Sequence, residues 1–309
     1  MPTVEELIGN TPLVRVNRIE GLKGREVYVK LEYMNPTGSH KDRIALYMIR
    51  DAVEKGLLRP GGTVVEASSG NTAISVAWLA RRLGFKAVIV VEEGTSPAKV
   101  AVLRALGAEV IFAPKVPAGH PDHMVNVARR VASERGGVFL AQYSNEANLR
   151  AHYETTGPEI YRALGDKIGC FVMGVGTGGT LVGVSKYLKG LLGHRVKAVA
   201  VVPRGSPIVG GAGRGEEIEG LAVSMIPDIF ARNRGLVDEV VEVSLAESVE
   251  WMVRLAREEG ILGGLSTGAN MAGVYKVLEG CEGAIVTLAP DSIFRYTGVL
   301  ENYAIRDIL

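Results

Sequence analysis

A lysine at the start of a predicted helix is the first residue whose type and position suggest chemistry. Lys41 lies in PTGSHKDR at 36–43, between a predicted strand at 26–32 and apolar residues with helical spacing at 44–52. Ser39 is a suitable N-cap, which places Lys41 in the first helical turn, where the helix dipole disfavours a cation. The position suits a neutral amine that acts as a nucleophile or forms an imine with a carbonyl cofactor. On this stretch alone, a solvated surface lysine remains the alternative.

A glycine-rich loop, GVGTGGT at 174–180, lies between a predicted strand and a predicted helix. Its backbone N–H groups and the helix dipole form an anion site, and glycine allows close approach of a phosphate. The next strand, 196–202, is not followed by the acid of a dinucleotide site, and the loop lacks the lysine of a triphosphate site. A single phosphate monoester fits best. A glycine turn that only permits close helix packing is the alternative.

Two more loops precede predicted helices. In EASSGNT at 66–72, four side chains offer more hydrogen-bonding groups than a helix cap requires: Ser68, Ser69, Asn71 and Thr72. A substrate carboxylate would be well received there. In GGLSTGA at 263–269, Ser266 is an ordinary cap residue when considered alone. A reactive lysine, a phosphate site and a carboxylate site together suggest pyridoxal 5′-phosphate (PLP), with one aldehyde and one phosphate, and an amino-acid substrate.

Strands and helices that alternate along the chain must position these loops. The strands are continuous apolar runs, such as AVIVV at 87–91 and EVIF at 109–112, as is typical of parallel strands buried on both faces. The alternation predicts a wound α/β architecture with two α/β domains. Ligands of such sheets bind beyond the carboxyl ends of the strands, so the loops that follow strands are the expected sites.

The composition favours small-molecule chemistry. The 309 residues are 47% hydrophobic with a formal net charge of +1, and no basic run indicates nucleic acid or an anionic membrane as partner. No apolar stretch is long enough to span a bilayer, and the acidic start MPTVEELIGNTP does not resemble a signal peptide, so we expect a cytoplasmic protein. Cys170 and Cys281 lack metal-ligand spacing, and neither is expected to be a reactive thiol. Scarce Gln and Cys hint at a thermophilic source.

The motifs together resemble the fold-type II PLP enzymes of the cysteine synthase (O-acetylserine sulfhydrylase) family, with cystathionine β-synthase as a relative. The similarity extends over nearly the whole chain, and the motifs that carry it are IGNTPLVRV at 8–16, NPTGSHKDRIA at 35–45, EASSGNTAIS at 66–75, LRALGAEVIF at 103–112, GVGTGGT at 174–180 and GILGGLSTGA at 260–269. The most specific stretch is QYSNEANLRAHYETTGPEI at 142–160, which resembles this family rather than threonine dehydratases or threonine synthases.

The resemblance implies two wound α/β domains like those of tryptophan synthase β, with PLP in the cleft between them. The smaller domain would span 36–145 and contain a mobile subdomain at about 85–135 that closes on the substrate. The larger, phosphate-binding domain would combine 1–35 with 146–309.

The resemblance also implies roles for single residues. Lys41 would hold the cofactor covalently and then act as base and acid at the substrate Cα, and Asn71 would bond the cofactor's phenolic oxygen. Ser266 would face the pyridine nitrogen, where a hydroxyl stabilises no pyridinium and so favours loss of a β leaving group. The phosphate would be held by Gly176, Thr177, Gly178, Gly179 and Thr180. The substrate carboxylate would be held by Ser68, Ser69, Thr72 and Gln142.

The implied reaction is β-replacement. An activated L-serine, either O-acetylserine or O-phosphoserine, would lose its leaving group and take up sulfide to give L-cysteine. Members of the family are usually homodimers. The alternatives are a lyase resembling cystathionine β-synthase or a threonine/serine dehydratase, and a non-catalytic binding or regulatory protein with the same fold. Thr72 argues against a dehydratase, since those enzymes typically carry histidine there.

Several stretches depart from the family pattern. His40 stands beside Lys41 where the family usually has an apolar residue, and we interpret it as a packing variant rather than a second base. Ala73 replaces a common glycine, and 289–297 keeps Pro-Asp and Arg-Tyr but lacks the usual glycine and Ser-Thr.

A further departure lies in the loop that lines the active-site entrance in the family. EEIEGLAVSMIP at 216–227 replaces a stretch richer in glycine, and Arg204 and Arg214 lie in or near it. Either arginine could meet a phosphate leaving group, which makes O-phosphoserine a candidate donor.

Overall fold

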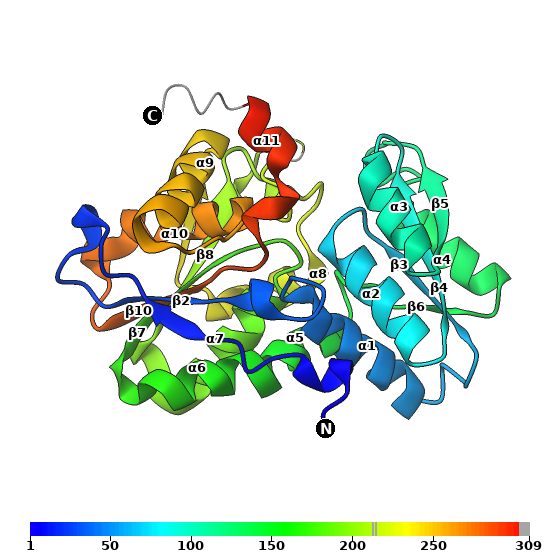
Figure 1. The fold of residues 1–309 in the computed structure, drawn as a ribbon, viewed down its shortest axis with the longest axis horizontal. Coiled ribbons are helices and arrows are strands. Elements are labelled where there is room, and N and C mark those ends of the chain that lie inside the picture. Colours follow the sequence, from blue (N-terminus) through cyan, green and yellow to red (C-terminus); the bar gives the residue numbers. More distant parts are fainter. Residues whose placement is uncertain (212, 214, 303–309) are drawn as a thin grey trace. The chain divides into compact units, whose positions relative to one another are not determined.

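The computed structural model describes residues 1–211, 213 and 215–302 (Figure 1). The chain divides into two compact units. Unit 1 comprises Met1–Ile8 and Lys41–Ala151, and unit 2 comprises Gly9–His40 and His152–Leu309. The domains implied by the resemblance, 36–145 and 1–35 with 146–309, stay a prediction beside these compact units. No helix within the described ranges is both long and apolar enough to cross a membrane.

Unit 1 is built on a parallel four-stranded sheet in the order β5-β4-β3-β6. The strands are β3 (Thr63–Ala67), β4 (Lys86–Glu92), β5 (Glu109–Ala113) and β6 (Val138–Phe139). The helices are α1 (Lys41–Glu54), α2 (Asn71–Arg82), α3 (Pro97–Ala105), α4 (Met124–Glu134) and α5 (Glu146–Ala151). Val64 and Ile89 pack with α1 and α2, whereas Val65 and Val90 pack with α4. Because alternate strand residues face opposite ways, helices cover both faces of this sheet.

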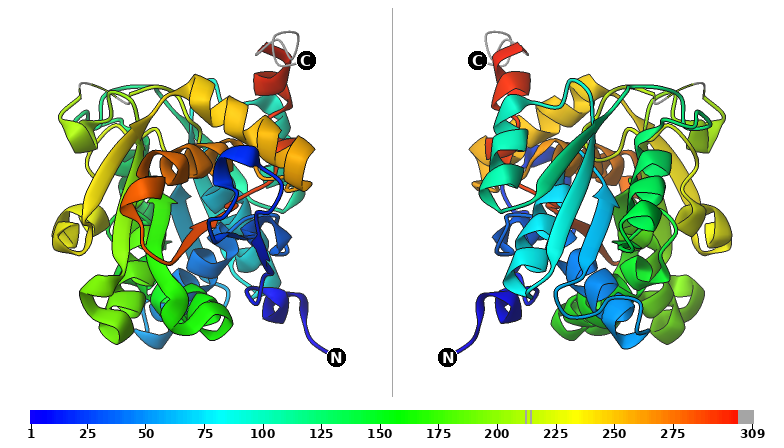
Figure 2. Two further views of the ribbon diagram at one scale, coloured as in Figure 1. Left: turned by 90° about the vertical axis from the view of Figure 1, so that its left-hand side faces the viewer. Right: turned by 90° about the vertical axis from the view of Figure 1, so that its right-hand side faces the viewer.

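Unit 2 is built on a six-stranded sheet in the order β1-β2-β10-β7-β8-β9, in which only the β1–β2 pair is antiparallel (Figure 2). The strands are β1 (Leu13–Arg15), β2 (Val27–Lys30), β7 (Ile168–Gly174), β8 (Lys197–Pro203), β9 (Glu239–Val243) and β10 (Ala284–Leu288). The helices are α6 (Gly157–Leu164), α7 (Gly179–Leu192), α8 (Asp228–Arg232), α9 (Leu245–Arg254), α10 (Leu265–Val277) and α11 (Thr297–Asn302). One core cluster joins α9 and α10 to the sheet, and another joins α6 and α7 to it.

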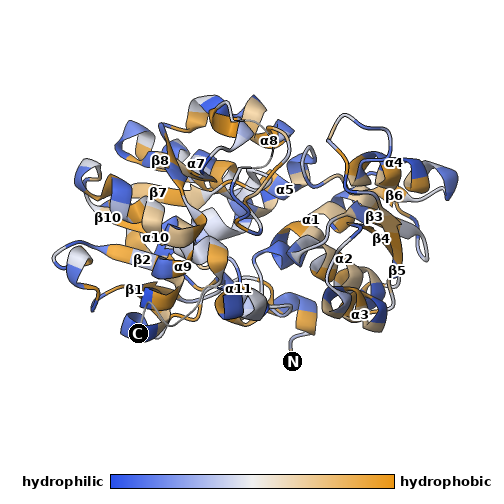
Figure 3. Cartoon of the chain, turned by 90° about the horizontal axis from the view of Figure 1, so that it is seen from above, coloured by the Kyte–Doolittle hydropathy of each residue, from blue (hydrophilic) through white to orange (hydrophobic). Residues whose placement is uncertain are grey.

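The apolar runs that predicted parallel strands are the buried strands of the two sheets. All seven residues of β7 and six of the seven in β8 are buried, and both strands carry hydrophobic colours in Figure 3. Such strands gain most of their stability from burial on both faces. The predicted wound α/β fold is confirmed.

The polar stretch 143–150 predicts a loop that leads into a helix at about 151–164, and the structure differs at both places. The stretch 143–150, predicted as a loop, contains most of α5, whose start is stabilised by Asn145 Oδ1 accepting from the Ala147 N–H at 2.9 Å. The helix predicted at 151–164 is instead a π-helical turn, η4 (His152–Thr156), followed by α6. A Cβ at Gly157 would lie 2.8 Å from the Tyr187 Cβ, so glycine is needed for α6 to pack closely on α7.

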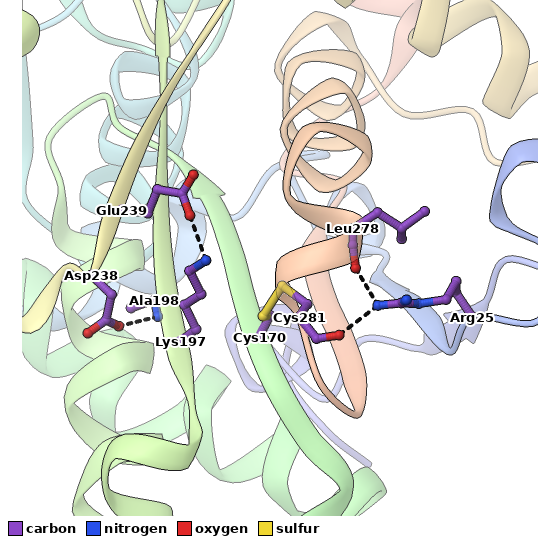
Figure 4. Close-up of a disulfide and its surroundings, with 8 residues drawn as sticks. All are labelled: Arg25, Cys170, Lys197, Ala198, Asp238, Glu239, Leu278 and Cys281. Atoms are coloured by element: carbon purple, nitrogen blue, oxygen red, sulfur yellow. Dashed lines mark hydrogen bonds and ion pairs between the residues drawn. A yellow bond between two sulfur atoms is a disulfide. The ribbon is translucent and has the colours of Figure 1, made fainter.

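A disulfide joins the two cysteines of the chain, which sequence reasoning did not pair. Cys170 lies in β7 and Cys281 lies just before β10, and the two strands pair in parallel, so the Cα atoms are 5.9 Å apart (Figure 4). Beside the bond, the Arg25 guanidinium donates to the Leu278 carbonyl and, at 2.6 Å, to the Cys281 carbonyl. Both sulfurs therefore belong to a structural disulfide, which agrees with the expectation that neither is a reactive thiol.

We predict that reduction of this disulfide strongly destabilises the protein. The bond closes a loop between residues 111 apart in sequence, and the loss of loop entropy in the unfolded chain gives a stabilisation of about 5 kcal/mol. Chemical unfolding with and without a reductant measures this difference. The double variant Cys170→Ala/Cys281→Ala is the control and should be insensitive to the reductant. Equal stability of the oxidised and reduced wild type would contradict the prediction.

Candidate active site

In unit 1, the loops after β3 and β6 bring together three of the residues predicted to bind the substrate carboxylate. The Thr72 hydroxyl donates to Gln142 Oε1 at 2.7 Å, and Gln142 Nε2 donates to the Ala67 carbonyl at 3.1 Å. Ser68 follows Ala67, and its Oγ accepts from the Gly70 N–H at 3.3 Å. The first N–H groups of α2 have no acceptor within the helix. The cluster therefore has the donors that a carboxylate needs.

Ser69, the fourth of these residues, is tied to the end of β4. Its Oγ accepts from the Glu92 N–H at 3.1 Å and lies 3.0 Å from Thr95 Oγ1. Thr95 in turn donates to the Glu92 carbonyl at 2.6 Å. Both partners belong to the segment 85–135 that is predicted to move on substrate binding. Ser69 thus connects the proposed carboxylate site to that segment within unit 1.

Lys41 and Asn71 each begin a helix, and the two helices are joined near their starts. Lys41 is the first residue of α1, and Asn71 is the first residue of α2. The Ser75 hydroxyl of α2 donates to Asp42 Oδ1 of α1 at 2.6 Å, and both side chains are completely buried. This bond fixes the start of α1 relative to α2. The predicted roles of Lys41 and Asn71 stay predictions.

In unit 2, the segment that leads to Lys41 is held by the stretch 289–297, whose departures from the family pattern drew attention. Ser39 forms an antiparallel bridge with Asp291, and the His40 N–H donates to the Pro290 carbonyl at 2.9 Å. The Arg295 guanidinium donates to the Thr37 carbonyl. The retained Pro-Asp and Arg-Tyr residues thus position the backbone immediately before Lys41.

The predicted phosphate loop joins β7 to α7. Gly178 has a φ of +85°, and a Cβ at Gly176 would lie 2.3 Å from the Gly220 carbonyl oxygen, so both positions require glycine. Thr177 Oγ1 accepts from the Gly179 N–H at 3.3 Å, and Thr180 is buried in the first turn of α7. A helix start with bare backbone and two hydroxyl groups suits one phosphate. The residues present therefore fit the phosphate of PLP.

Ser266 lies in the first turn of α10, one residue inside the helix rather than in the loop before it. It is buried, and nearby the Tyr296 hydroxyl donates to Asp291 Oδ2 at 2.6 Å. Burial, followed by the negative charge of Asp291, raises the pKa of Tyr296 well above its usual value, so Tyr296 stays a donor. A Cβ at Gly264 would lie 2.2 Å from Asp291 Oδ1, so glycine lets this carboxylate approach the start of α10.

Arg204 and Arg214 are the two arginines that were considered as binding partners of a phosphate leaving group. Arg204 Nη1 lies 3.7 Å from Glu216 Oε1, and its side chain is 64% exposed. A carboxylate that close partly balances its charge, which weakens the case for Arg204 as an anion site. Arg214 lies outside the described residues.

Glu66 lies beside the predicted site residues, and sequence reasoning missed it. It ends the apolar stretch of β3, is completely buried, and accepts from the Ala67 N–H at 2.9 Å and the Gln142 N–H at 3.4 Å. Burial raises its pKa to about 8, while those N–H groups and the positive charge of Lys41 act in the opposite direction. The only signal in the sequence was an acid among apolar residues, directly before the SSGNT loop.

Comparison with known proteins places these features in context. A family model described as pyridoxal-phosphate dependent enzyme matches residues 4–291. Cysteine synthase 1 of Neurospora crassa is 41% identical over 301 residues, covering 94% of this chain and 80% of the relative. The cysteine synthase of Staphylococcus aureus is 38% identical, covering 95% and 94%. Cystathionine beta-synthase of Apis mellifera is 38% identical and covers 96% of this chain, although the match spans 60% of that protein.

Solved structures are also similar to this chain over nearly its whole length. O-ureido-L-serine synthase superposes with a TM-score of 0.90 at 33% identity, covering 98% of this chain and 96% of that one. A hydrogen sulfide-producing enzyme from Fusobacterium nucleatum gives a TM-score of 0.88 at 35% identity, covering 96% and 98%. At these values the likeness extends across both units.

We predict that Glu66 makes stability fall as the pH rises. In the unfolded chain an ordinary Glu loses its proton near its usual pKa, whereas folded Glu66 keeps it until about pH 8, so folding takes up a proton between these values. Relative to Glu66→Gln, the wild type should therefore lose about 4 kcal/mol of unfolding free energy between about pH 5 and pH 8.

The measurement is chemical unfolding at a series of pH values. Glu109→Gln is a control with the opposite sign, since the hydrogen bond from Arg135 lowers the pKa of Glu109, so the contribution of Glu109 is lost only in acid. Parallel stability profiles for the wild type and Glu66→Gln would show that Glu66 is ionised in the folded protein and would contradict the prediction.

Proposed function

Because the chain belongs to the pyridoxal-phosphate-dependent enzymes and is of the cysteine synthase type, we propose that it makes L-cysteine from an activated L-serine and sulfide. The predicted family, fold class and PLP cofactor are confirmed by these matches. The observation that carries the proposal is the Thr72–Gln142 pair beside Ser68, because these residues, which the resemblance assigns to the substrate carboxylate, lie together in unit 1.

Each predicted residue around the cofactor has a separate proposed role. When bound, PLP supplies an electron-withdrawing ring that acidifies the Cα–H of an attached amino acid. Lys41 would hold the cofactor through its amine, and the same amine, when free, would take the Cα proton. Asn71 bonds the phenolic oxygen, and Ser266 faces the pyridine nitrogen without adding a charge there.

The remaining residues bind and orient. The loop 176–180 holds the phosphate through backbone N–H groups and hydroxyls. The carboxylate site holds the amino acid so that its Cα–H is in reach of Lys41. Its members are Ser68, Ser69, Thr72 and Gln142.

The donor is O-acetylserine or O-phosphoserine. The ion pair of Arg204 with Glu216 favours O-acetylserine, because it reduces the positive charge available to a phosphate leaving group. A nucleophile other than sulfide is the second candidate, since one structural relative is named for making O-ureido-L-serine. Lyase activity of the cystathionine β-synthase or dehydratase kind stays a third possibility, which product analysis with and without sulfide tests.

We further propose that the enzyme is a cytoplasmic homodimer with no nucleic-acid or membrane partner. The relatives that match over most of their length are cysteine synthases, and the chain carries no basic run. A disulfide in a cytoplasmic protein is typical of hyperthermophiles, which agrees with the composition.

The absorption spectrum tests the assignment directly. We expect purified protein to absorb near about 410 nm after incubation with PLP, and the Lys41→Ala variant to lack this band. Addition of O-acetylserine or O-phosphoserine should shift the band to longer wavelength for the donor that is used, and sulfide should restore it. No band in the wild type would contradict the cofactor assignment, and a band without any shift would indicate a non-catalytic relative.

The carboxylate site is tested at Thr72. Thr72→Val keeps the shape of the side chain but removes the donor to Gln142 Oε1, so the amide loses the bond that fixes it. We expect the KM for the activated serine to rise about tenfold with a smaller effect on kcat, because the lost interactions bind the ground and transition states alike. Thr72→Ser is the matched control and should behave as the wild type. Equal effects of the two substitutions would argue against the hydroxyl.

A further inference from the structure

Two buried histidines flank the last hydroxyl of the phosphate loop in unit 2. Thr180 Oγ1 lies 3.1 Å from His152 Nε2 and 3.4 Å from His40 Nδ1. The centroids of the two imidazole rings are 5.8 Å apart. His152 is completely buried, and His40 and Thr180 are exposed by only 6% and 5%. The residues come from three separate elements, since His40 ends the segment before α1, His152 begins η4, and Thr180 lies in α7.

The hydrogen bonds of His152 indicate which of its ring nitrogens carries the proton. Thr156 Oγ1 lies 2.9 Å from His152 Nδ1, is completely buried, and has no other hydrogen-bond partner among the described residues. A buried hydroxyl proton without an acceptor is costly, so Thr156 donates to Nδ1. The proton of neutral His152 then lies on Nε2, which faces Thr180 Oγ1. His152 therefore donates to the Thr180 hydroxyl oxygen.

This donation determines where the Thr180 proton can point. A hydroxyl has one proton and two acceptor lone pairs, and His152 uses one lone pair. If His40 Nδ1 also carries a proton, it uses the second, and the Thr180 O–H must point away from both rings. Thr180 belongs to the 176–180 loop, whose helix start favours an anion. An anion there accepts the Thr180 proton only when neither ring competes for it.

We propose that His40 and His152 are positioning residues that orient the Thr180 hydroxyl proton toward the phosphate of the bound cofactor. The inference rests on the proposed function for the identity of the anion. It gives His40, which replaces a usual apolar residue of the family, a role as a donor through Nδ1 rather than as packing or as a second base. The two histidines act through Thr180 and have no proposed contact with the reacting atoms.

Paired substitutions test the donors one at a time. An asparagine amide reaches the position of Nδ1, so His40→Asn should keep the donor and His40→Val should lose it. A glutamine amide reaches the position of Nε2, so His152→Gln should keep the donor and His152→Asn should lose it. We expect about tenfold weaker PLP binding in His40→Val and His152→Asn, the usual scale for loss of a group that orients a ligand-binding residue, and much smaller losses in their partners. The ³¹P resonance of the bound cofactor should shift in the same two variants.

Two controls separate positioning from structural damage. Pyridoxal lacks the phosphate, so its affinity should not change in any of the four variants. In a Thr180→Val background the hydroxyl is absent, so the histidine substitutions should have no further effect on PLP affinity. Equal losses in each pair, equal losses for pyridoxal, or losses that persist with Thr180→Val would overturn the inference.

Failure of the proposed function would be visible separately. If the wild type binds no PLP, the cofactor assignment fails, and the same variants are then titrated with inorganic phosphate while thermal unfolding is followed. Weaker stabilisation by phosphate in His40→Val and His152→Asn, but not in their partners, would still support the orienting role. Unchanged stabilisation in all four would overturn it.

Discussion

Helix starts, where the first backbone N–H groups have no acceptor within the helix itself, are the constraint on which the proposed chemistry depends. The helices α1, α2, α7 and α10 each begin at a residue or loop that carries a predicted site residue. The first turn of a helix has no internal acceptors and carries the positive end of the dipole. Anions are therefore stabilised there and cations are not. The predicted phosphate at 176–180, the predicted carboxylate at 68–72 and a neutral amine at Lys41 would all satisfy this rule.

The buried Glu66 adds a second electrostatic condition near Lys41. An ionised carboxylate would stabilise the lysine as a cation, whereas a protonated one does not. Because burial raises the pKa of Glu66 to about 8, the carboxyl carries its proton at neutral pH and adds no negative charge beside Lys41. Glu66 also accepts from the Gln142 N–H, so the same carboxyl fixes the start of the carboxylate site.

Much of the fold followed from the sequence because parallel strands are apolar throughout. Strands such as β7 and β8 need no long-range information to be recognised, since burial on both faces excludes polar residues. The disulfide and the role of 289–297 could not be predicted, because both depend on strand order. Cys170 and Cys281 meet only because β10 lies beside β7, and Asp291 supports the approach to Lys41 only because β10 also lies beside β2. The helix α5 was missed because its polar start matches a loop in composition.

The site residues were predicted by type, but their connections were not. Ser69 was expected to bind a carboxylate, and the structure adds that its hydroxyl is bonded to Glu92 and Thr95 at the end of β4. In both bonds the Ser69 hydroxyl oxygen is the acceptor, so neither bond uses the Ser69 proton. Ser69 therefore joins the start of α2 to the end of β4 within unit 1, so the predicted movement of 85–135 would act on the same residue that is predicted to bind the substrate carboxylate.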